Sequence, residues 1–448
     1  MVKIFKISSL FFVLIFILGC SFQNSGGFFE SKIEEFEKEI QRKNSKVVFA
    51  PQKKFDKEIS GIVSKNLNKP LMIKKWTQNG LNYNNEIPNL YYKNDKNILF
   101  KSKKIGKNKY NSAENFFEPL IQKNRIFFSD FSGNIYNYSL ITKQVIWKFN
   151  FYKKRYKNFP IKIQLGLLKN NLIVSDNLGY LYSINIETSE INWAKNYGIA
   201  FNSNLKIKDN KIFSLNQENK FYLINERDGN QILDLETFPS VLKSKYKTNI
   251  SLDDKNNVFF ITSNGELYSI NYLTNNINWL SNIFSKNTAV ETELFYSSPI
   301  VVKKEKIFFS SSVSTFSIDS INGLVNWELP FSTNLSPLVT DRFVFLASKE
   351  GFIINIDNTN GKVNWSKNLF NEKSKPKKNK VGEIISILLV SDQILATTSK
   401  GYFLFIDYKN GKLLNYTKAS KSGFYSSPII VNDMIYTIDK NFRLLIFN

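Results

Sequence analysis

Three aspartates recur at one place in successive segments of the chain, and their type and spacing could form a metal or catalytic centre. Asp319 ends FSID, Asp357 ends INID and Asp407 ends LFID. If the fold brought these repeated carboxylates together around a common axis, they could serve as metal ligands. Each aspartate is, however, followed four residues later by a glycine, as in DNTNG and DYKNG, and aspartate commonly caps such turns by bonding to its own backbone. We therefore predict that all three cap turns, and that the chain has no catalytic residues and no metal site.

The composition excludes most of the usual enzyme chemistries. The 448 residues include no histidine, which removes imidazole bases, Ser-His and Cys-His pairs, histidine-containing zinc sites and histidine-ligated haem. The single cysteine excludes an intramolecular disulfide and an all-cysteine metal site. An enzyme built from this chain would depend on carboxylates, lysine, tyrosine or a bound cofactor. We expect a non-enzymatic protein without a cofactor.

A tryptophan recurs near the end of similar units, and this repeat indicates the architecture that must position these side chains. Degenerate copies place Phe100, Leu233 and Asn415 in the same slot, and successive slots lie 38 to 50 residues apart. A fixed period of about 40 to 50 residues is typical of solenoids and propellers. The tryptophans in the slot are Trp147, Trp193, Trp279, Trp327 and Trp365.

Each unit contains four short strands separated by turn-type clusters. In the second unit the strands are IKIQLGL, NLIVSD, YLYSINI and INWAKN, with the β-branched and aromatic residues that half-buried strands favour. Four strands at this period predict the blade of a β-propeller. The expected fold is all-β, an eight-bladed propeller of four-stranded antiparallel blades.

The two ends of the chain support the count of eight. After Asn415 the segment FYSSPIIVNDMIYTIDKNFRLLIFN supplies only three strands, and KNILFKSKKI (96–105) offers the missing outer strand. Pairing the two would close the ring and remove a free sheet edge. We predict that this N-terminal strand completes the last blade; seven blades with a stray strand is the alternative.

The repeated tryptophan has two interpretations. It could be an exposed aromatic site for ligand stacking, or a ring that docks onto the neighbouring blade and fills the wedge between them. Its identical placement in successive units favours docking, through buried area and ring packing.

The net charge of +23 also has two interpretations. The lysines could simply be spread over solvated loops, or they could attract an acidic partner or a membrane surface. The densest basic stretches, KKRYK (153–157) and KSKPKKNK (373–380), lie between units. They lack the aromatic interleaving typical of nucleic-acid binding, so no nucleic-acid partner is expected.

Residues 1–19 have the features of a lipoprotein signal peptide. Two lysines precede the apolar run LFFVLIFIL, which is too short to span a bilayer as a helix. The sequence ILGC resembles the bacterial lipobox and makes Cys20 the lipidated first residue; an ordinary signal peptide is the alternative. Ser21, rather than aspartate, follows the cysteine, which favours the periplasmic face of the outer membrane as the destination.

Residues 20–75 are expected to form a lipidated tail rather than a blade. FESKIEEFEKEIQRKN has apolar residues at spacings of 4, 3 and 4, which predicts a short helix. The rest of the tail is predicted to be an extended tether, and the propeller is placed at 76–448. Trp76 lies outside the repeated slot and receives no role.

The unit Gly-x-x-Tyr-x-Ile-Asn/Asp, followed by Gly-x-x-x-Trp, resembles the PQQ-like, tryptophan-docking propeller repeat. Exported chains of two families carry it: the quinoprotein alcohol and glucose dehydrogenases, and BamB, the lipoprotein subunit of the outer-membrane β-barrel assembly machinery. A quinoprotein would need a calcium-bound quinone, an aspartate base and often a vicinal disulfide, which one cysteine cannot form. The resemblance to BamB covers roughly residues 76–448, and the lipobox and the missing chemistry favour it.

The resemblance implies a lipid-anchored scaffold, monomeric outside its complex, that binds the periplasmic domains of the central barrel subunit, BamA. The matching loop is TFPSVLKSK (237–245), with Val241, Leu242 and Lys243 at the contact and Lys245 as an alternative basic residue. A PQQ-dependent dehydrogenase-like quinoprotein and an envelope-polymer-binding lipoprotein are the alternative functions.

The acidic half of that contact departs from the family pattern. The family uses an acidic pair just before a Thr-Thr-Pro. The corresponding SSP is here preceded by Leu-Phe-Tyr, and the nearest acids, Glu291 and Glu293, are displaced.

Overall fold

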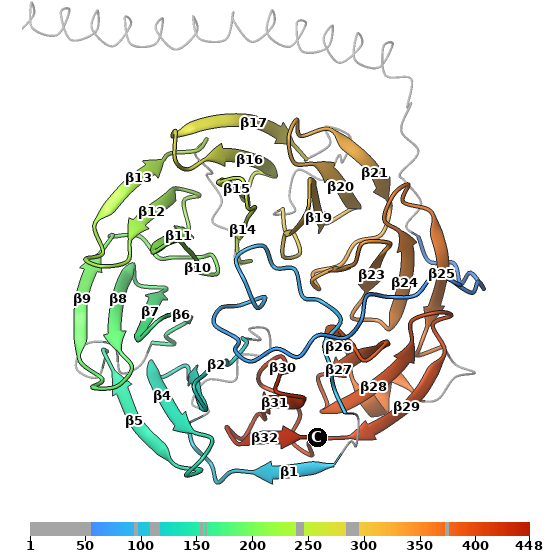
Figure 1. Cartoon of the computed structure of the whole chain (residues 1–448), viewed down its shortest axis with the longest axis horizontal. Coiled ribbons are helices and arrows are strands. Elements are labelled where there is room, and N and C mark those ends of the chain that lie inside the picture. The colour runs from blue at the N-terminus through green and yellow to red at the C-terminus, as the bar shows by residue number, and fades with distance from the viewer. Residues whose placement is uncertain are drawn as a thin grey trace, which may run out of the picture. The chain divides into compact units, whose positions relative to one another are not determined.

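Eight four-stranded antiparallel sheets stand around a common axis (Figure 1). The computed structural model describes residues 55–93, 97–107, 117–152, 156, 159–238, 246–283, 295–371 and 376–448, all within one compact unit, Lys54–Asn448. The predicted eight-bladed, all-β propeller is confirmed. Cys20 and the helix predicted after it lie outside the described residues. None of the helices in these ranges is long and apolar enough to cross a membrane.

The first four blades each consist of four consecutive strands. They are β2 (Leu120–Gln122), β3 (Arg125–Ser129), β4 (Asn134–Ser139) and β5 (Val145–Asn150); β6 (Ile163–Leu168), β7 (Asn171–Asp176), β8 (Tyr180–Asn185) and β9 (Ile191–Asn196); β10 (Lys206–Lys208), β11 (Lys211–Leu215), β12 (Phe221–Asn225) and β13 (Gln231–Leu235); and β14 (Asn249–Leu252), β15 (Asn257–Ile261), β16 (Glu266–Asn271) and β17 (Asn276–Asn282).

The next three blades repeat this order, and the eighth has three consecutive strands plus one from the N-terminal side. They are β18 (Val301–Lys303), β19 (Lys306–Ser310), β20 (Thr315–Asp319) and β21 (Val325–Leu329); β22 (Leu338–Val339), β23 (Phe343–Ala347), β24 (Phe352–Asp357) and β25 (Val363–Asn368); β26 (Ile384–Val390), β27 (Gln393–Thr398), β28 (Tyr402–Asp407) and β29 (Leu413–Lys418), preceded by the short helix α3 (Lys378–Val381); and β30 (Ile429–Val431), β31 (Met434–Ile438), β32 (Leu444–Phe447) and β1 (Ile98–Lys101).

The predicted closure of the ring is confirmed. β1 pairs antiparallel with β32, and Phe100 lies opposite Ile446, the same register that places Trp147 opposite Asn137 in the first blade. The largest apolar cluster joins the first two blades to the last two. The seam between the two ends of the chain is therefore packed as core.

Each tryptophan of the repeated slot packs onto the next blade. Its indole nitrogen donates a hydrogen bond of 2.8–3.0 Å to a backbone carbonyl just after the third strand of that blade. Trp365 is fully buried and Trp327 nearly so, while the other three are half-buried. The acceptors for Trp147, Trp193, Trp279, Trp327 and Trp365 are Ile186, Glu226, Ser320, Asn358 and Tyr408.

Several of these indoles contact a glycine of the next blade, in the turn between its third and fourth strands. A Cβ built on Gly411 would come within 2.6 Å of the Trp365 ring, and one on Gly361 within 2.7 Å of the Trp327 ring. Both glycines have positive φ, at 74°. The turn thus needs glycine for two independent reasons, the left-handed backbone and the close approach of the indole.

The contribution of the indole contact can be separated from that of the backbone. Gly411→Ala is expected to lower the free energy of unfolding by about 2–4 kcal/mol, combining overpacking of about 1–3 with a left-handed penalty of about 1. Gly198→Ala is the matched control, since Gly198 has φ +80° and no neighbour within 4 Å of the added Cβ. It should lose about 1 kcal/mol in urea unfolding. Equal losses in the two variants would show that the Trp365 contact contributes nothing.

The three aspartates cap turns, as predicted. Asp319 Oδ1 accepts hydrogen bonds from the backbone nitrogens of Ile321 and Asn322 at 2.8 and 3.2 Å. Asp357 and Asp407 accept equivalent bonds at 2.8 and 2.9 Å. Their carboxylates are engaged locally, each within its own blade.

A segment that belongs to no blade runs from the outer strand of blade six, where Ile59 bridges Ser366, to the centre of the ring (Figure 1, blue trace). We call residues 55–93 the plug segment. It includes residues 55–75, which the sequence analysis assigned to the tail, and it continues past Trp76 without entering a blade. The compact unit accordingly begins at Lys54.

The plug segment hydrogen bonds to all eight blades, mostly at their innermost strands. It lies on the side of the ring that carries the turns between first and second strands, which we call the plug face. The opposite side, with the turns between second and third strands, is the loop face. In blade order the contacts are Trp76 with Ile121, Thr77 with Leu167, Gln78 with Ile207, Tyr83 with Leu252, Asn84 with Val302, Asn68 with Asp341, Leu90 with Leu389 and Ile73 with Asn432.

Candidate functional site

The predicted partner-binding residues all lie outside the part of the chain that the structure describes. They are Val241, Leu242, Lys243, Lys245, Glu291 and Glu293. What the structure shows is how the residues on either side of these segments are held. Both segments connect a fourth strand to the next first strand, so their ends lie on the loop face.

Hydrogen bonds to two neighbouring turns hold the residues before the 239–245 segment. Thr237 Oγ1 donates to the Asn219 carbonyl at 3.2 Å. Asn264 Nδ2 donates to the Phe238 carbonyl, also at 3.2 Å. The Phe238 side chain is 62% exposed, although its backbone is bound. The backbone just before the segment is therefore held in place, and the Phe238 ring there is exposed to solvent.

The residues after the segment are fixed as well, and they meet the second predicted segment. Asn202 Nδ2 donates to the Tyr246 carbonyl at 2.7 Å. The rings of Tyr246 and Tyr296 lie 5.2 Å apart. Tyr246 directly follows Lys245, and Tyr296 lies three residues after Glu293. The structure thus brings together the described ends of the two segments that the sequence analysis singled out.

A cavity of about 350 Å³ opens on the same face. Its walls include Phe117, Phe131, Phe201 and Tyr425, together with Lys247. The lining as a whole comes from strand ends and turns of blades one, two, three and eight, and Lys247 comes from the connection between blades three and four. The plug segment lies on the opposite face of the ring, and none of its residues lines this recess.

Buried charges lie between the cavity and the plug segment. Glu118 Oε2 accepts hydrogen bonds from Trp76 Nε1 at 2.8 Å and from the Gly80 nitrogen at 2.7 Å. Burial raises the pKa of Glu118, and these two hydrogen bonds oppose the rise. Lys206 Nζ donates to the carbonyls of Asn79 and Asn82 at 2.6 and 2.8 Å. Burial lowers the pKa of Lys206 to about 7, although Glu118 counteracts it.

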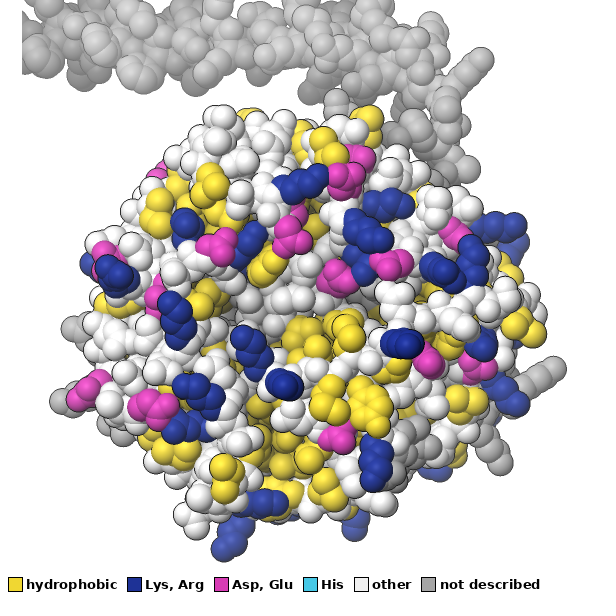
Figure 2. All heavy atoms as spheres, viewed as in Figure 1, with side chains coloured by type: hydrophobic (Ala, Val, Ile, Leu, Met, Phe, Trp, Pro, Cys, Tyr) yellow, Lys and Arg dark blue, Asp and Glu magenta, His cyan; other side chains and the backbone are white. Residues whose placement is uncertain are grey.

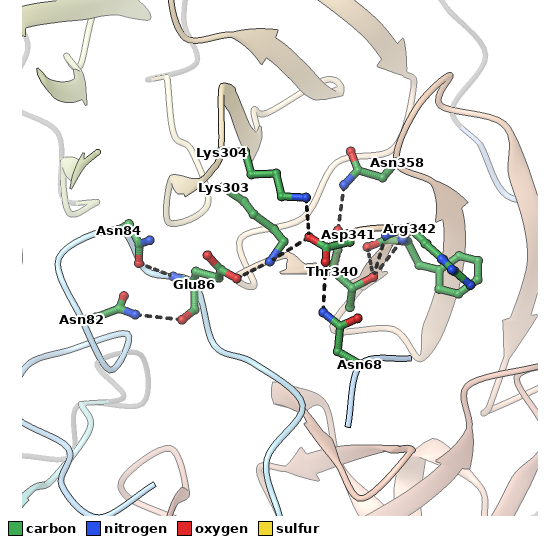
Figure 3. Close-up of polar contacts among 11 residues, drawn as sticks. Asn68, Asn82, Asn84, Glu86, Lys303, Lys304, Thr340, Asp341, Arg342 and Asn358 are labelled. Carbon is green, nitrogen blue, oxygen red and sulfur yellow. Dashed lines mark hydrogen bonds and ion pairs between the residues drawn. The ribbon is translucent and has the colours of Figure 1, made fainter. Parts of the chain in front are cut away.

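An ion-pair network ties the plug segment to blades five and six on the plug face (Figure 3). Lys303 pairs with Glu86 of the plug segment, and also with Asp341 at 3.4 Å. Lys304 pairs with Asp341 at 3.1 Å, and Asn68 Nδ2 donates to the same carboxylate at 3.0 Å. The hydrogen bond from Asn68, followed by those from the lysines, lowers the pKa of Asp341 to about 2.

The lowered pKa of Asp341 predicts a loss of stability in acid. Its pKa in the folded chain lies below the ordinary value of 3.8, so its contribution is complete above about pH 5 and disappears as the pH falls towards 2. Because Asp341 is 36% exposed, solvent screening should hold the contribution below about 1 kcal/mol. The unfolding free energies of the parent and Asp341→Asn should therefore differ at pH 6 and converge near pH 2. A gap that widened in acid would contradict this.

The charges on the face drawn in Figure 2 are mixed. Lys and Arg side chains are spread around the ring with Asp and Glu side chains among them, and hydrophobic side chains gather at the centre. This distribution favours the first interpretation of the net charge on this face, lysines spread over a solvated surface. In the described ranges, no three His, Cys, Asp or Glu side chains are grouped so that they could hold a metal.

Sequence reasoning missed the plug segment and the buried charges around Trp76. Trp76 is fully buried, and its backbone pairs with Ile121 by two hydrogen bonds of 2.8 Å. The available signal was a large aromatic residue outside the repeated slot in a segment without a repeat of its own.

Comparison with known proteins gives one family and several similar folds. The family model described as outer membrane protein assembly factor BamB matches residues 132–367. No curated protein matches the chain in sequence. Among solved structures, BamB from Moraxella catarrhalis is similar at 11% identity and a TM-score of 0.60, over 78% of this chain and 99% of that one.

Quinone-dependent enzymes share the same fold at similarly low sequence identity. A europium-containing methanol dehydrogenase is similar at 11% identity and a TM-score of 0.60, over 81% of this chain and 89% of that one. The quinohemoprotein alcohol dehydrogenase from Comamonas testosteroni has 10% identity and a TM-score of 0.59, over 81% and 76% of the two chains. At these identities the likenesses show the fold alone.

Proposed function

Because the chain belongs to the family of the outer membrane protein assembly factor BamB, we propose that it is a non-enzymatic scaffold subunit of the machinery that assembles outer-membrane β-barrel proteins. In this proposal Cys20 carries the lipid that anchors it to the periplasmic face of the outer membrane. Its partner is the periplasmic region of a BamA-like barrel subunit.

The observation that carries the proposal is the family match, which runs from the third strand of blade one to the fourth strand of blade six. The loop face supports it, because the described ends of the 239–245 and 284–294 segments meet through Tyr246 and Tyr296. Exposed aromatic and apolar side chains on anchored loops are a common form of protein-binding surface. Phe238 offers such a side chain at the base of the first segment.

The proposal is tested by crosslinking from the loop face. A photo-crosslinking residue at Phe238 in the membrane-bound chain should capture the barrel subunit. A crosslinking residue at Leu273 is the matched control, since Leu273 is similarly exposed at 58% but lies in a turn on the plug face. Leu242→Glu should reduce recovery of the barrel subunit at least tenfold, and Leu273→Glu should leave it unchanged. Equal capture from both faces, or recovery of no assembly component, would refute the proposal.

A further inference from the structure

The recess on the loop face contains a cation without a carboxylate partner. Lys247 lines the recess and is half-buried. Its Nζ donates to two neutral amide oxygens, Gln164 Oε1 at 3.2 Å and Asn204 Oδ1 at 3.4 Å. Both bonds are long, and no described carboxylate lies within ion-pair distance. Partial burial of an ammonium group without a counter-ion is energetically unfavourable.

Neither nearby acid can take that place. Asp130 lines the recess, but its carboxylate already accepts hydrogen bonds from Ser132, Asn134 and Tyr136 at 2.8–3.1 Å. Glu118 lies deeper and is bound by Trp76 and Gly80. The recess therefore holds an excess of positive charge. Burial, and secondly the like charge of Lys162, lowers the pKa of Lys247 to about 8, with Glu118 opposing the shift.

The rest of the recess combines apolar walls with unused polar groups. The Tyr425 ring packs edge-on against Phe117 and Phe131, with centroids 4.8 and 5.6 Å apart. Among the described residues the Tyr425 hydroxyl makes no hydrogen bond, and neither does the side-chain amide of Gln217. Both line the recess. A ligand would thus meet two lysines, Lys162 and Lys247, together with neutral polar groups and five aromatic rings in the same wall.

We propose that this recess binds a carboxylate carried on an apolar group, with Lys247 as the counter-ion and Tyr425 as a hydrogen-bond donor. The carboxylate supplies the charge that Lys247 lacks, through charge-assisted hydrogen bonds. The apolar group replaces water against the aromatic rings, as is usual in small-molecule sites. Because the plug segment occupies the opposite end of the axis, the ligand enters from the loop face.

The test compares an acid with its own amide. Titration calorimetry of the full-length chain with 3-phenylpropionate should show saturable binding, and 3-phenylpropionamide should bind at least tenfold more weakly. An acetylated trileucine with a free C-terminus, set against its amidated form, tells whether a peptide end fits as well as a free acid. Equal binding of acid and amide, or no binding by any of the four probes, would overturn the proposal.

Variants assign the binding to named residues. Lys247→Gln should weaken 3-phenylpropionate at least tenfold, and Tyr425→Phe should weaken it severalfold while keeping the aromatic wall. Lys195→Gln is the matched control, an exposed lysine on β9 away from the recess. If Lys247→Gln does not fold, the acid–amide comparison and Tyr425→Phe still decide the outcome. A Lys247→Gln variant that binds as the parent does would show that Lys247 only ties its own loop to blade two.

Discussion

Replacing Trp76 with alanine is expected to lower the free energy of unfolding by about 3–5 kcal/mol, the usual range for a fully buried large aromatic. Trp76 is 0% exposed and belongs to the apolar cluster that joins the first and last blades. Its indole also donates to Glu118, so the substitution leaves a buried carboxylate with one bond fewer. Urea unfolding followed by circular dichroism measures the loss.

Two companion variants separate packing from hydrogen bonding. Trp76→Phe keeps most of the ring volume but not the bond to Glu118, and it should lose about 1–3 kcal/mol. Trp147→Ala removes a half-buried tryptophan of the repeated slot and should lose less than Trp76→Ala. If Trp76→Ala unfolds within about 0.5 kcal/mol of the parent, the plug segment is not part of the folded core.

Removing residues 444–448 is expected to abolish cooperative unfolding. The deletion takes away β32, which lies between β1 and β31. Its four apolar residues are each at most 6% exposed. Burial of a large apolar side chain contributes about 1.5–3 kcal/mol, so the four together approach the 5–15 kcal/mol by which a typical domain is stable. Two further sheet edges would also be left unpaired.

Limited proteolysis and the sharpness of the urea transition measure this outcome. The deleted chain should be cleaved rapidly and should show no steep transition. Leu99→Ser is the control, because Leu99 on β1 is 51% exposed and its replacement should change stability by less than about 0.5 kcal/mol. A deleted chain that unfolds as sharply as the parent would mean that the ring does not depend on its closing strand.

The repeat predicted the blades because most units carry the same signals: four alternating strands, a turn and an aromatic residue in the slot, which only Leu233 and Asn415 replace. It predicted the turn conformation less well than the turn position. Gly411 and Gly361 adopt positive φ, but Lys143, Ser189 and Asn275 occupy the same place with φ of 56°, 63° and 62°. The backbone of the turn is thus conserved among blades where glycine is not.

The plug segment could not be predicted because nothing in it repeats. Its contacts come from single side chains and backbone groups, such as Asn85 with Ile300 and Gln78 with Ile207. These pairs are more than 100 residues apart in sequence. Hydrogen bonds of this kind leave no hydrophobic period, and the many asparagines of the segment are equally typical of loops. Likewise, no local pattern marks Lys247, whose neighbours in the recess come from several blades.

The pairing of β1 with β32 also constrains when the ring can close during folding. Among the described strands, β1 is the first to be synthesised, and β32, its one neighbour in the sheet, is the last. Throughout translation, and during any transport that follows, the N-terminal strand waits with an unpaired edge while some 340 residues separate it from its partner. Native pairing at such a separation is slow, and exposed edges are prone to wrong partners in the meantime. A protein built this way would gain most from a chaperone early in its life, before its C-terminus has emerged.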